Sequence, residues 1–261
     1  MMHVKSPAVA GLFYPGDAGV LRETLRDFMR EARANNDERP YALIAPHAGY
    51  QYSGPIAASA YATLRPWAQE IHRVVVLAPS HRVPFSGLAT SSADLFRTPL
   101  GDIAVDRTAV DDLENLAGVH RLDAAFAEEH ALEVQLPFLQ TVLGEFTLVP
   151  LIVGDADAGQ VSTVLEALWR PDTLIVVSSD LSHYHDYRSC QQLDRSTSAL
   201  IEQMQAEQIG PYDACGAYPI RGLLKTAQRH GWRVRTLDLR NSGDTAGDKS
   251  RVVGYGAYEF Y

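Results

Sequence analysis

Two histidines follow apolar runs in the same way. Residues 43–49 read L-I-A-P-H-A-G and residues 77–81 read L-A-P-S-H, so His47 and His81 each come just after a proline. Imidazole binds several transition metals and exchanges protons near neutral pH. A single histidine in such a place is usually an ordinary loop residue, but the repeated context favours a shared role as metal ligands.

Further candidates follow two later apolar runs. Residues 178–185, S-S-D-L-S-H-Y-H, contain Asp180 and His183, and the loop N-S-G-D-T-A-G-D at 241–248 contains Asp244. Carboxylates and imidazoles can bind metals or move protons. The acidic residues of the second loop could equally be polar turn residues, which a glycine-rich loop favours.

Glu129 and Glu133 lie one turn apart in a helix that the apolar spacing predicts over residues 126–143, with His130 between them. Two carboxylates at this spacing commonly form a solvated helix face. Because the rest of the helix is apolar, a place near a pocket is the alternative. Glu129 is therefore a candidate catalytic residue.

The elements expected to position these residues alternate along the chain. Helices are predicted at 18–33, 54–64, 126–143, 156–169, 187–206 and 218–230, and strands at 41–45, 73–78, 146–153, 173–179, 233–239 and 251–260. This alternation predicts an α/β fold, a single domain over residues 1–261 whose mostly parallel central sheet has helices on both faces. Ligands of such sheets bind beyond the carboxyl ends of the strands, where the candidate residues lie.

Composition limits the classes of partner. Of the 261 residues, 46% are hydrophobic and 21% charged, and the net charge of −9 argues against a nucleic-acid partner. No apolar run approaches the roughly 20 residues that span a membrane. Two cysteines and no signal-peptide pattern favour a cytoplasmic protein, and the oligomeric state stays open.

Two further expectations concern the pocket and the last strand. Tyr50, Tyr52 and Phe85 are expected to line the mouth of the pocket, since they follow the two histidine-bearing strands. The strand at 251–260 is expected to be buried and structural, with glycines that admit a close neighbour.

Motifs spread over nearly the whole chain carry a family resemblance. They are P-A-V-A-G-L-F-Y-P at 7–15, A-P-H-A-G-Y-Q-Y-S-G at 45–54, L-A-P-S-H at 77–81, E-E-H-A-L-E-V-Q-L-P-F at 128–138, S-S-D-L-S-H at 178–183 and R-V-V-G-Y at 251–255. The sequence resembles the MEMO family, whose bacterial and archaeal members are called AmmeMemoRadiSam system protein B. That family is similar in fold to the class III extradiol dioxygenases, which hold a non-haem iron at the matching edge of the sheet.

The resemblance implies a divalent metal held by His47 and His81, with iron expected first and copper or zinc as alternatives. It places His183 as the acid/base residue, with Asp180 in the same pocket. A cysteine completes the metal site of animal members, but the loop at 241–248 has none, and neither cysteine of this chain is expected at the site. Asp244 is the first choice for the third ligand.

The other choices for that ligand are Asp180, Glu129 or water. The function that follows from the resemblance is a dioxygenase-like oxidoreductase acting on a small-molecule substrate. The alternative is a non-catalytic metal-binding or protein-interaction module on the same fold, because one fold can carry many functions. A hydrolase with Ser80 or Ser179 as nucleophile ranks last, since neither serine lies in a G-x-S-x-G motif.

Overall fold

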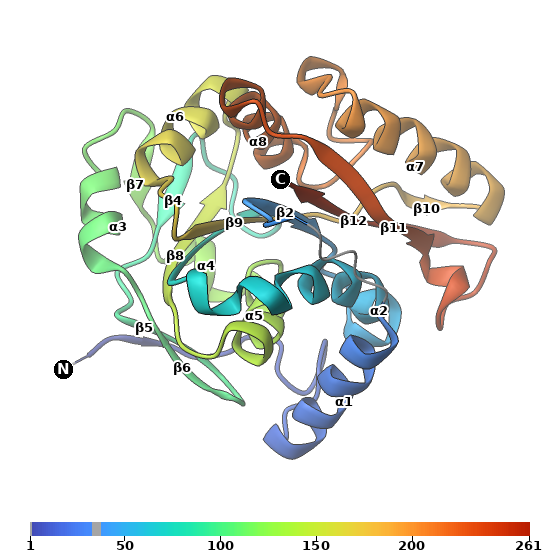
Figure 1. Cartoon of the computed structure of the whole chain (residues 1–261), viewed down its shortest axis with the longest axis horizontal. Helices are drawn as coiled ribbons and strands as arrows, with labels where there is room; N and C mark the ends of the chain where they lie inside the picture. Colours follow the sequence, from blue (N-terminus) through green and yellow to red (C-terminus); the bar gives the residue numbers. More distant parts are fainter. Residues whose placement is uncertain (1, 33–37) are drawn as a thin grey trace.

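A large central sheet organises the protein (Figure 1). The computed structural model describes residues 2–32 and 38–261, and within them nine strands form this sheet. Their order is β10 (His183–His185), β12 (Val252–Phe260), β2 (Ala42–Ala45), β9 (Thr173–Ser178), β3 (Arg73–Pro79), β8 (Thr147–Val153), β4 (Leu88–Thr90) and β7 (Val119–Arg121), while β11 (Val234–Asn241) pairs with β12.

The middle of the sheet is parallel, and the strand on either side of it runs antiparallel to it. Strands β2, β9, β3 and β8 run in the same direction, as the sequence predicts. By contrast, β12 is antiparallel to β2, and β4 is antiparallel to β8. The sheet is therefore mixed, and the expectation of a parallel sheet holds for its centre.

Helices cover both faces of the sheet (Figure 1). On one side lie α6 (Ala158–Leu168), α7 (Tyr187–Glu202) and α8 (Ala217–His230), and on the other lie α1 (Ala18–Glu31), α2 (Tyr50–Tyr61) and α5 (Leu136–Leu143). No helix in the described part of the chain is long and apolar enough to cross a membrane. These two helical layers confirm the predicted α/β fold.

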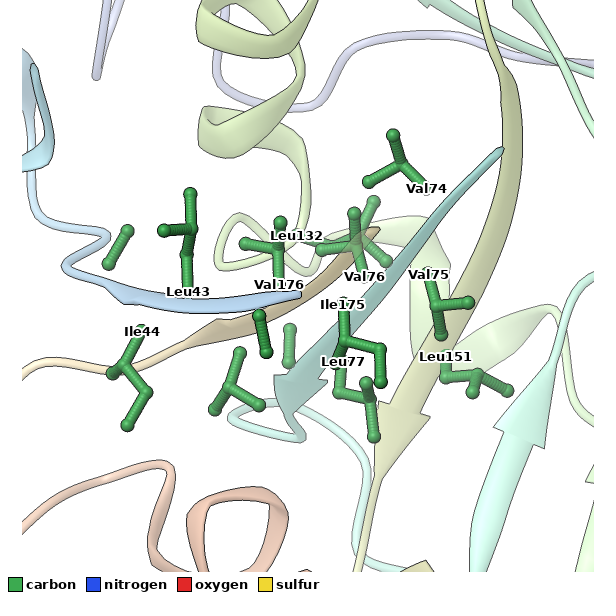
Figure 2. Packing of buried hydrophobic residues seen from close by; sticks show 14 of the residues in the cluster. Leu43, Ile44, Val74, Val75, Val76, Leu77, Leu132, Leu151, Ile175 and Val176 are labelled. Carbon is green, nitrogen blue, oxygen red and sulfur yellow. The ribbon is translucent and has the colours of Figure 1, made fainter. Parts of the chain in front are cut away.

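The four parallel strands form the centre of the core. Their residues are almost entirely buried, and Figure 2 shows that neighbours such as Leu43 and Ile44 point to opposite faces of the sheet. Strands that are buried on both faces read as continuous apolar runs, which is why the sequence identifies them. Their rigid ends are the fixed points of the candidate site.

Residues 86–122 contain elements that the sequence did not predict. They include β4, β7, α3 (Arg107–Leu113) and two strands of a small second sheet, β5 (Leu95–Thr98) and β6 (Gly101–Ala104), which β1 (Val4–Lys5) completes. Each of these strands has only two to four residues. Segments this short carry too little periodicity to be recognised.

The predicted helix at 126–143 is wrong as a continuous element. The chain forms α4 (Ala124–Ala127), a 3-10 turn at Glu133–Gln135 and then α5. Between α4 and the turn, the carboxylate of Glu129 accepts a hydrogen bond from the N–H of Ala131 at 2.9 Å. A side chain that binds the backbone locally competes with helix formation. The break leaves His130 in an irregular segment.

Candidate metal centre

Three histidines from separate segments meet in one group. His47 follows β2, His81 follows β3, and His130 lies in the break before α5. One nitrogen from each ring lies within 4.8 Å of the other two, so the group could hold a metal ion. The ring centroids are 5.0 to 5.4 Å apart. The sequence identified the first two histidines as ligands but assigned no role to the third.

These histidines line a large cavity that opens beyond the ends of the strands. Its volume is about 1040 Å³. Asp180 and His183, both predicted to share the pocket, also line it. The structure therefore brings together residues that follow three different parallel strands.

Glu129 anchors His81. Its two oxygens accept hydrogen bonds from the backbone N–H of His81 at 2.7 Å and from Nδ1 of its ring at 2.9 Å. Burial opposes ionisation of this carboxyl group, but the bond and charge of His81 outweigh it, and the pKa of Glu129 falls to about 2. Glu129 is therefore an ionised, buried carboxylate that orients the imidazole.

His47 is held from both its backbone and its ring. Its N–H donates to Oδ1 of Asp180 at 2.7 Å, and Nδ1 lies 2.9 Å from the hydroxyl of Ser178. Burial, helped by the nearby charge of His81, lowers the pKa of His47 well below its ordinary value. Burial also raises the pKa of Asp180, although the bond from His47 opposes this rise. A neutral imidazole is the form that binds metals.

His130 packs between a carboxylate and an aromatic ring. Its Nδ1 lies 3.4 Å from Glu129, and its ring is 4.7 Å from the ring of Phe13. Burial lowers the pKa of His130 to about 4. Within the described residues, the buried Nδ1 has no hydrogen-bond partner. The lowered pKa keeps the ring neutral near pH 7, which is the form that binds metals.

Glu133 holds the segment that carries Phe13. Its carboxylate accepts hydrogen bonds from the N–H of Ala8 at 2.6 Å and from the hydroxyl of Tyr14 at 2.7 Å. Phe13, between these two partners in the chain, contacts His130 and lines the cavity. Glu133 is thus buried and structural, in contrast to the solvated helix face that its spacing also allowed.

Asp244, the first choice for the third ligand, lies elsewhere. It is exposed and accepts hydrogen bonds from the hydroxyl of Tyr187 and the N–H of Asn241. Within the described chain, it belongs neither to the histidine group nor to the residues that line the cavity. His130 fills the third place of the group.

The expectation that no cysteine reaches the site is wrong. Cys215 precedes α8, lines the cavity and places its Sγ 3.2 Å from Nε2 of His47. Burial raises the pKa of this thiol. The N–H of Asp180 also donates to Sγ at 3.2 Å, which fixes the thiol beside the histidine. Its position depends on packing between distant segments and leaves no local pattern in the sequence.

The mouth of the cavity differs in part from the prediction. Tyr52 lines it, but Tyr50 is buried in the core, where its hydroxyl donates to the carbonyl oxygen of Val134 at 2.7 Å. Phe85 is not one of the described lining residues. Three exposed side chains instead stand at the mouth: Tyr184, Leu193 and Tyr212, which are 63%, 39% and 96% exposed.

Matches to known proteins cover nearly the whole chain. The model of the family described as Memo-like protein matches residues 5–259. A MEMO1 family protein from Methanopyrus kandleri is 36% identical over 279 residues, covering 98% of each chain, and one from Aquifex aeolicus is 34% identical, covering 97% of this chain and 98% of the other.

A solved structure shares the fold at low identity. The crystal structure of an uncharacterized protein from Escherichia coli K12 matches with a TM-score of 0.50 and 12% identity, covering 84% of this chain and 99% of the other. This likeness concerns the fold alone. The family match and the relatives carry the assignment, and this chain belongs to the Memo-like protein family.

Proposed function

We propose that this protein is a metal-dependent oxidoreductase that acts on a small-molecule substrate. The observation that carries the proposal is the group of His47, His81 and His130 at a cavity of about 1040 Å³. A structural metal site is usually closed by protein ligands, whereas a catalytic site keeps a position open. A ligand group beside a large cavity fits the second description.

The donor set suits a first-row transition metal. Imidazoles bind iron, copper, zinc and nickel. The sulfur of a cysteine such as Cys215, which lies beside His47, binds several of the same metals. We propose iron first, because the dioxygenases that the fold resembles hold iron; copper and zinc are the competing metals. When bound, a redox-active metal would supply electron transfer.

His183 is proposed as the acid/base residue. Its backbone is paired with β12, but its side chain lines the cavity and has no hydrogen-bond partner within the described chain, so its ring is free to exchange a proton with a bound molecule. Asp180 is proposed to shape the site from the other side by holding the backbone of His47. Glu129 acts through His81, which makes it a positioning residue for the metal.

The cavity mouth supports a substrate with an apolar part. Tyr184, Leu193 and Tyr212 expose large apolar surfaces there, and exposed apolar side chains gathered at one cavity often mark a binding site. Tyr184 also has a positive φ of 64°, and the guanidinium of Arg251 lies 4.6 Å from its ring centre. A strained residue held in place at a pocket is typical of functional sites.

Metal analysis of protein purified under anaerobic, reducing conditions tests the proposal. The parent should contain about one transition metal per chain, and alanine in place of His47, His81 or His130 should remove most of it. His120→Ala is the matched control, because this histidine is exposed and lies outside the group. His183→Ala should keep the metal but lose any turnover.

Two results would count against the proposal. Parent protein that takes up no added Fe(II), Cu(II) or Zn(II) would exclude a metal function. Stoichiometric metal that neither reduces O₂ nor responds to small molecules placed in the cavity would favour the alternative, a metal-binding module without catalysis.

A further inference from the structure

We propose that Gln135 and Ser178 are positioning residues that fix the tautomer of His47. They require Nδ1 of this histidine to carry the hydrogen and leave the lone pair of Nε2 free beside Cys215. The benefit to metal binding rests on the proposed function. The assignment of the hydrogen itself rests only on hydrogen-bond partners of the protein.

The orientation of the Gln135 amide is set by its neighbours. Its NH₂ group lies 3.0 Å from the carbonyl oxygen of Pro46 and 3.4 Å from that of Ala45, and both oxygens can only accept. On the other side, the hydroxyl of Tyr61 donates to Oε1 at 2.7 Å. Rotating the amide by half a turn would place its oxygen against two carbonyl oxygens with no hydrogen between them.

Ser178 has no hydrogen to spare for His47. Its hydroxyl lies 2.6 Å from the carbonyl oxygen of Ala131, which can only accept, so the single hydroxyl hydrogen must point there. The NH₂ group of Gln135 donates to Oγ at 2.8 Å and occupies one of its two lone pairs. The remaining lone pair faces Nδ1 of His47 at 2.9 Å.

It follows that Nδ1 of His47 is the donor. In a neutral imidazole only one nitrogen carries a hydrogen, so Nε2 is then an acceptor. The surroundings of Nε2 agree, because the thiol of Cys215 lies 3.2 Å away and can donate to it. A free Nε2 lone pair is also what a metal requires of a histidine ligand.

The rings of the two strand-end histidines are oriented by different means. The ring of His81 donates from Nδ1 to the ionised carboxylate of Glu129. His47 uses a neutral relay instead, from Tyr61 through Gln135 to Ser178, and every member of that relay is buried. The relay also holds the carbonyl of Pro46, the residue before His47, and so fixes both the ring and the turn that carries it.

The tautomer can be measured without any metal. In full-length, chelator-treated protein labelled with ¹⁵N-histidine, NMR correlation of ring nitrogens with ring protons shows which nitrogen of His47 carries the hydrogen. We expect the Nδ1–H form alone in the parent. Ser178→Ala removes the acceptor of the Nδ1 hydrogen, so this variant should populate the Nε2–H form. Gln135→Leu leaves the hydroxyl bonded to Ala131 but removes the N–H that holds Oγ and the carbonyl of Pro46, so it should populate the Nε2–H form to a smaller extent.

Ser162→Ala is the matched control, because this serine is also fully buried and hydrogen-bonded through its side chain but lies in α6. It should leave the His47 signals unchanged. Affinity for added Co(II) should fall about 10- to 100-fold in Ser178→Ala and stay within about threefold in the control.

The two proposals fail separately. An Nε2–H tautomer in the parent, or an unchanged tautomer in both relay variants, overturns the positioning role even if the protein binds metal. The parent spectrum decides this on its own if a variant does not fold. An Nδ1–H tautomer that shifts in the variants, in a protein that binds no metal, would leave the relay intact and overturn the proposed metal function.

Discussion

The backbone N–H of His47 donates a 2.7 Å hydrogen bond to Oδ1 of Asp180, and this bond joins the ends of two neighbouring parallel strands. Both residues line the same cavity. The loop that carries one residue of the histidine group is therefore fixed by a carboxylate that follows the next strand in the sheet, which gives Asp180 a structural role in addition to any chemical one.

Substitution of Asp180 should separate these two roles. Asp180→Asn keeps an oxygen that can accept from His47, so its free energy of unfolding should stay within about 1 kcal/mol of the parent. Asp180→Ala leaves a buried N–H without an acceptor and should lower that free energy by about 1–3 kcal/mol. Urea unfolding followed by circular dichroism measures both, and equal stability of the two variants would contradict the structural role.

Glu129→Gln should weaken metal binding without unfolding the protein. The variant loses the charge that pairs with His81, and a group that supports a ligand in this way typically contributes 10- to 100-fold in metal affinity. Competition with a chromophoric chelator measures this change. The neighbouring Glu128 is exposed, so Glu128→Gln is the control and should bind metal as the parent does.

The free energy of unfolding should depend on pH because burial lowers the pKa values of His130 and His47. The pKa of His130 is about 4 in the folded protein and near 6.5 when the chain is unfolded, so between these values the unfolded state binds the extra proton. Its contribution is present above pH 6.5 and is lost as the pH falls towards 4, by up to about 3 kcal/mol. His47, whose pKa is also lowered, changes stability in the same direction.

Urea unfolding of chelator-treated protein at several pH values measures this loss. The raised pKa of Asp180 acts with the opposite sign, because the folded state then holds the proton more tightly. His130→Gln removes the contribution of His130, so stability should change less steeply between pH 6.5 and 4, while the contribution of His47 remains. A variant as pH-sensitive as the parent would show that His130 is not the cause.

Truncation before Arg251 should prevent cooperative folding. It removes β12, which pairs with β2, β10 and β11 and buries Tyr255, Tyr258 and Phe260. Thermal unfolding should then show no sharp transition, whereas removal of Tyr261 alone should preserve one. A soluble truncated chain with a cooperative transition would refute the structural importance of this strand.

The sequence determined the framework of the site. Runs such as R-V-V-V-L-A identify strands buried on both faces, and the residues just after such strands must lie at one edge of a parallel sheet. Strand ends put His47, His81, Asp180 and His183 at that edge, and the cavity contains all four. They also predict Asp244 there, but this residue lies outside the described lining of the cavity. Local composition and strand direction were sufficient for this much.

Only the tertiary structure decided which other residues complete the group. His130 reaches it because the predicted helix breaks where Glu129 binds both His81 and the backbone at Ala131, and that contact exists only after β3 is in place. Cys215 arrives from the segment before α8 through its contact with Asp180. Such positions depend on contacts between residues far apart in the chain, which leave no period or spacing in the sequence to be read.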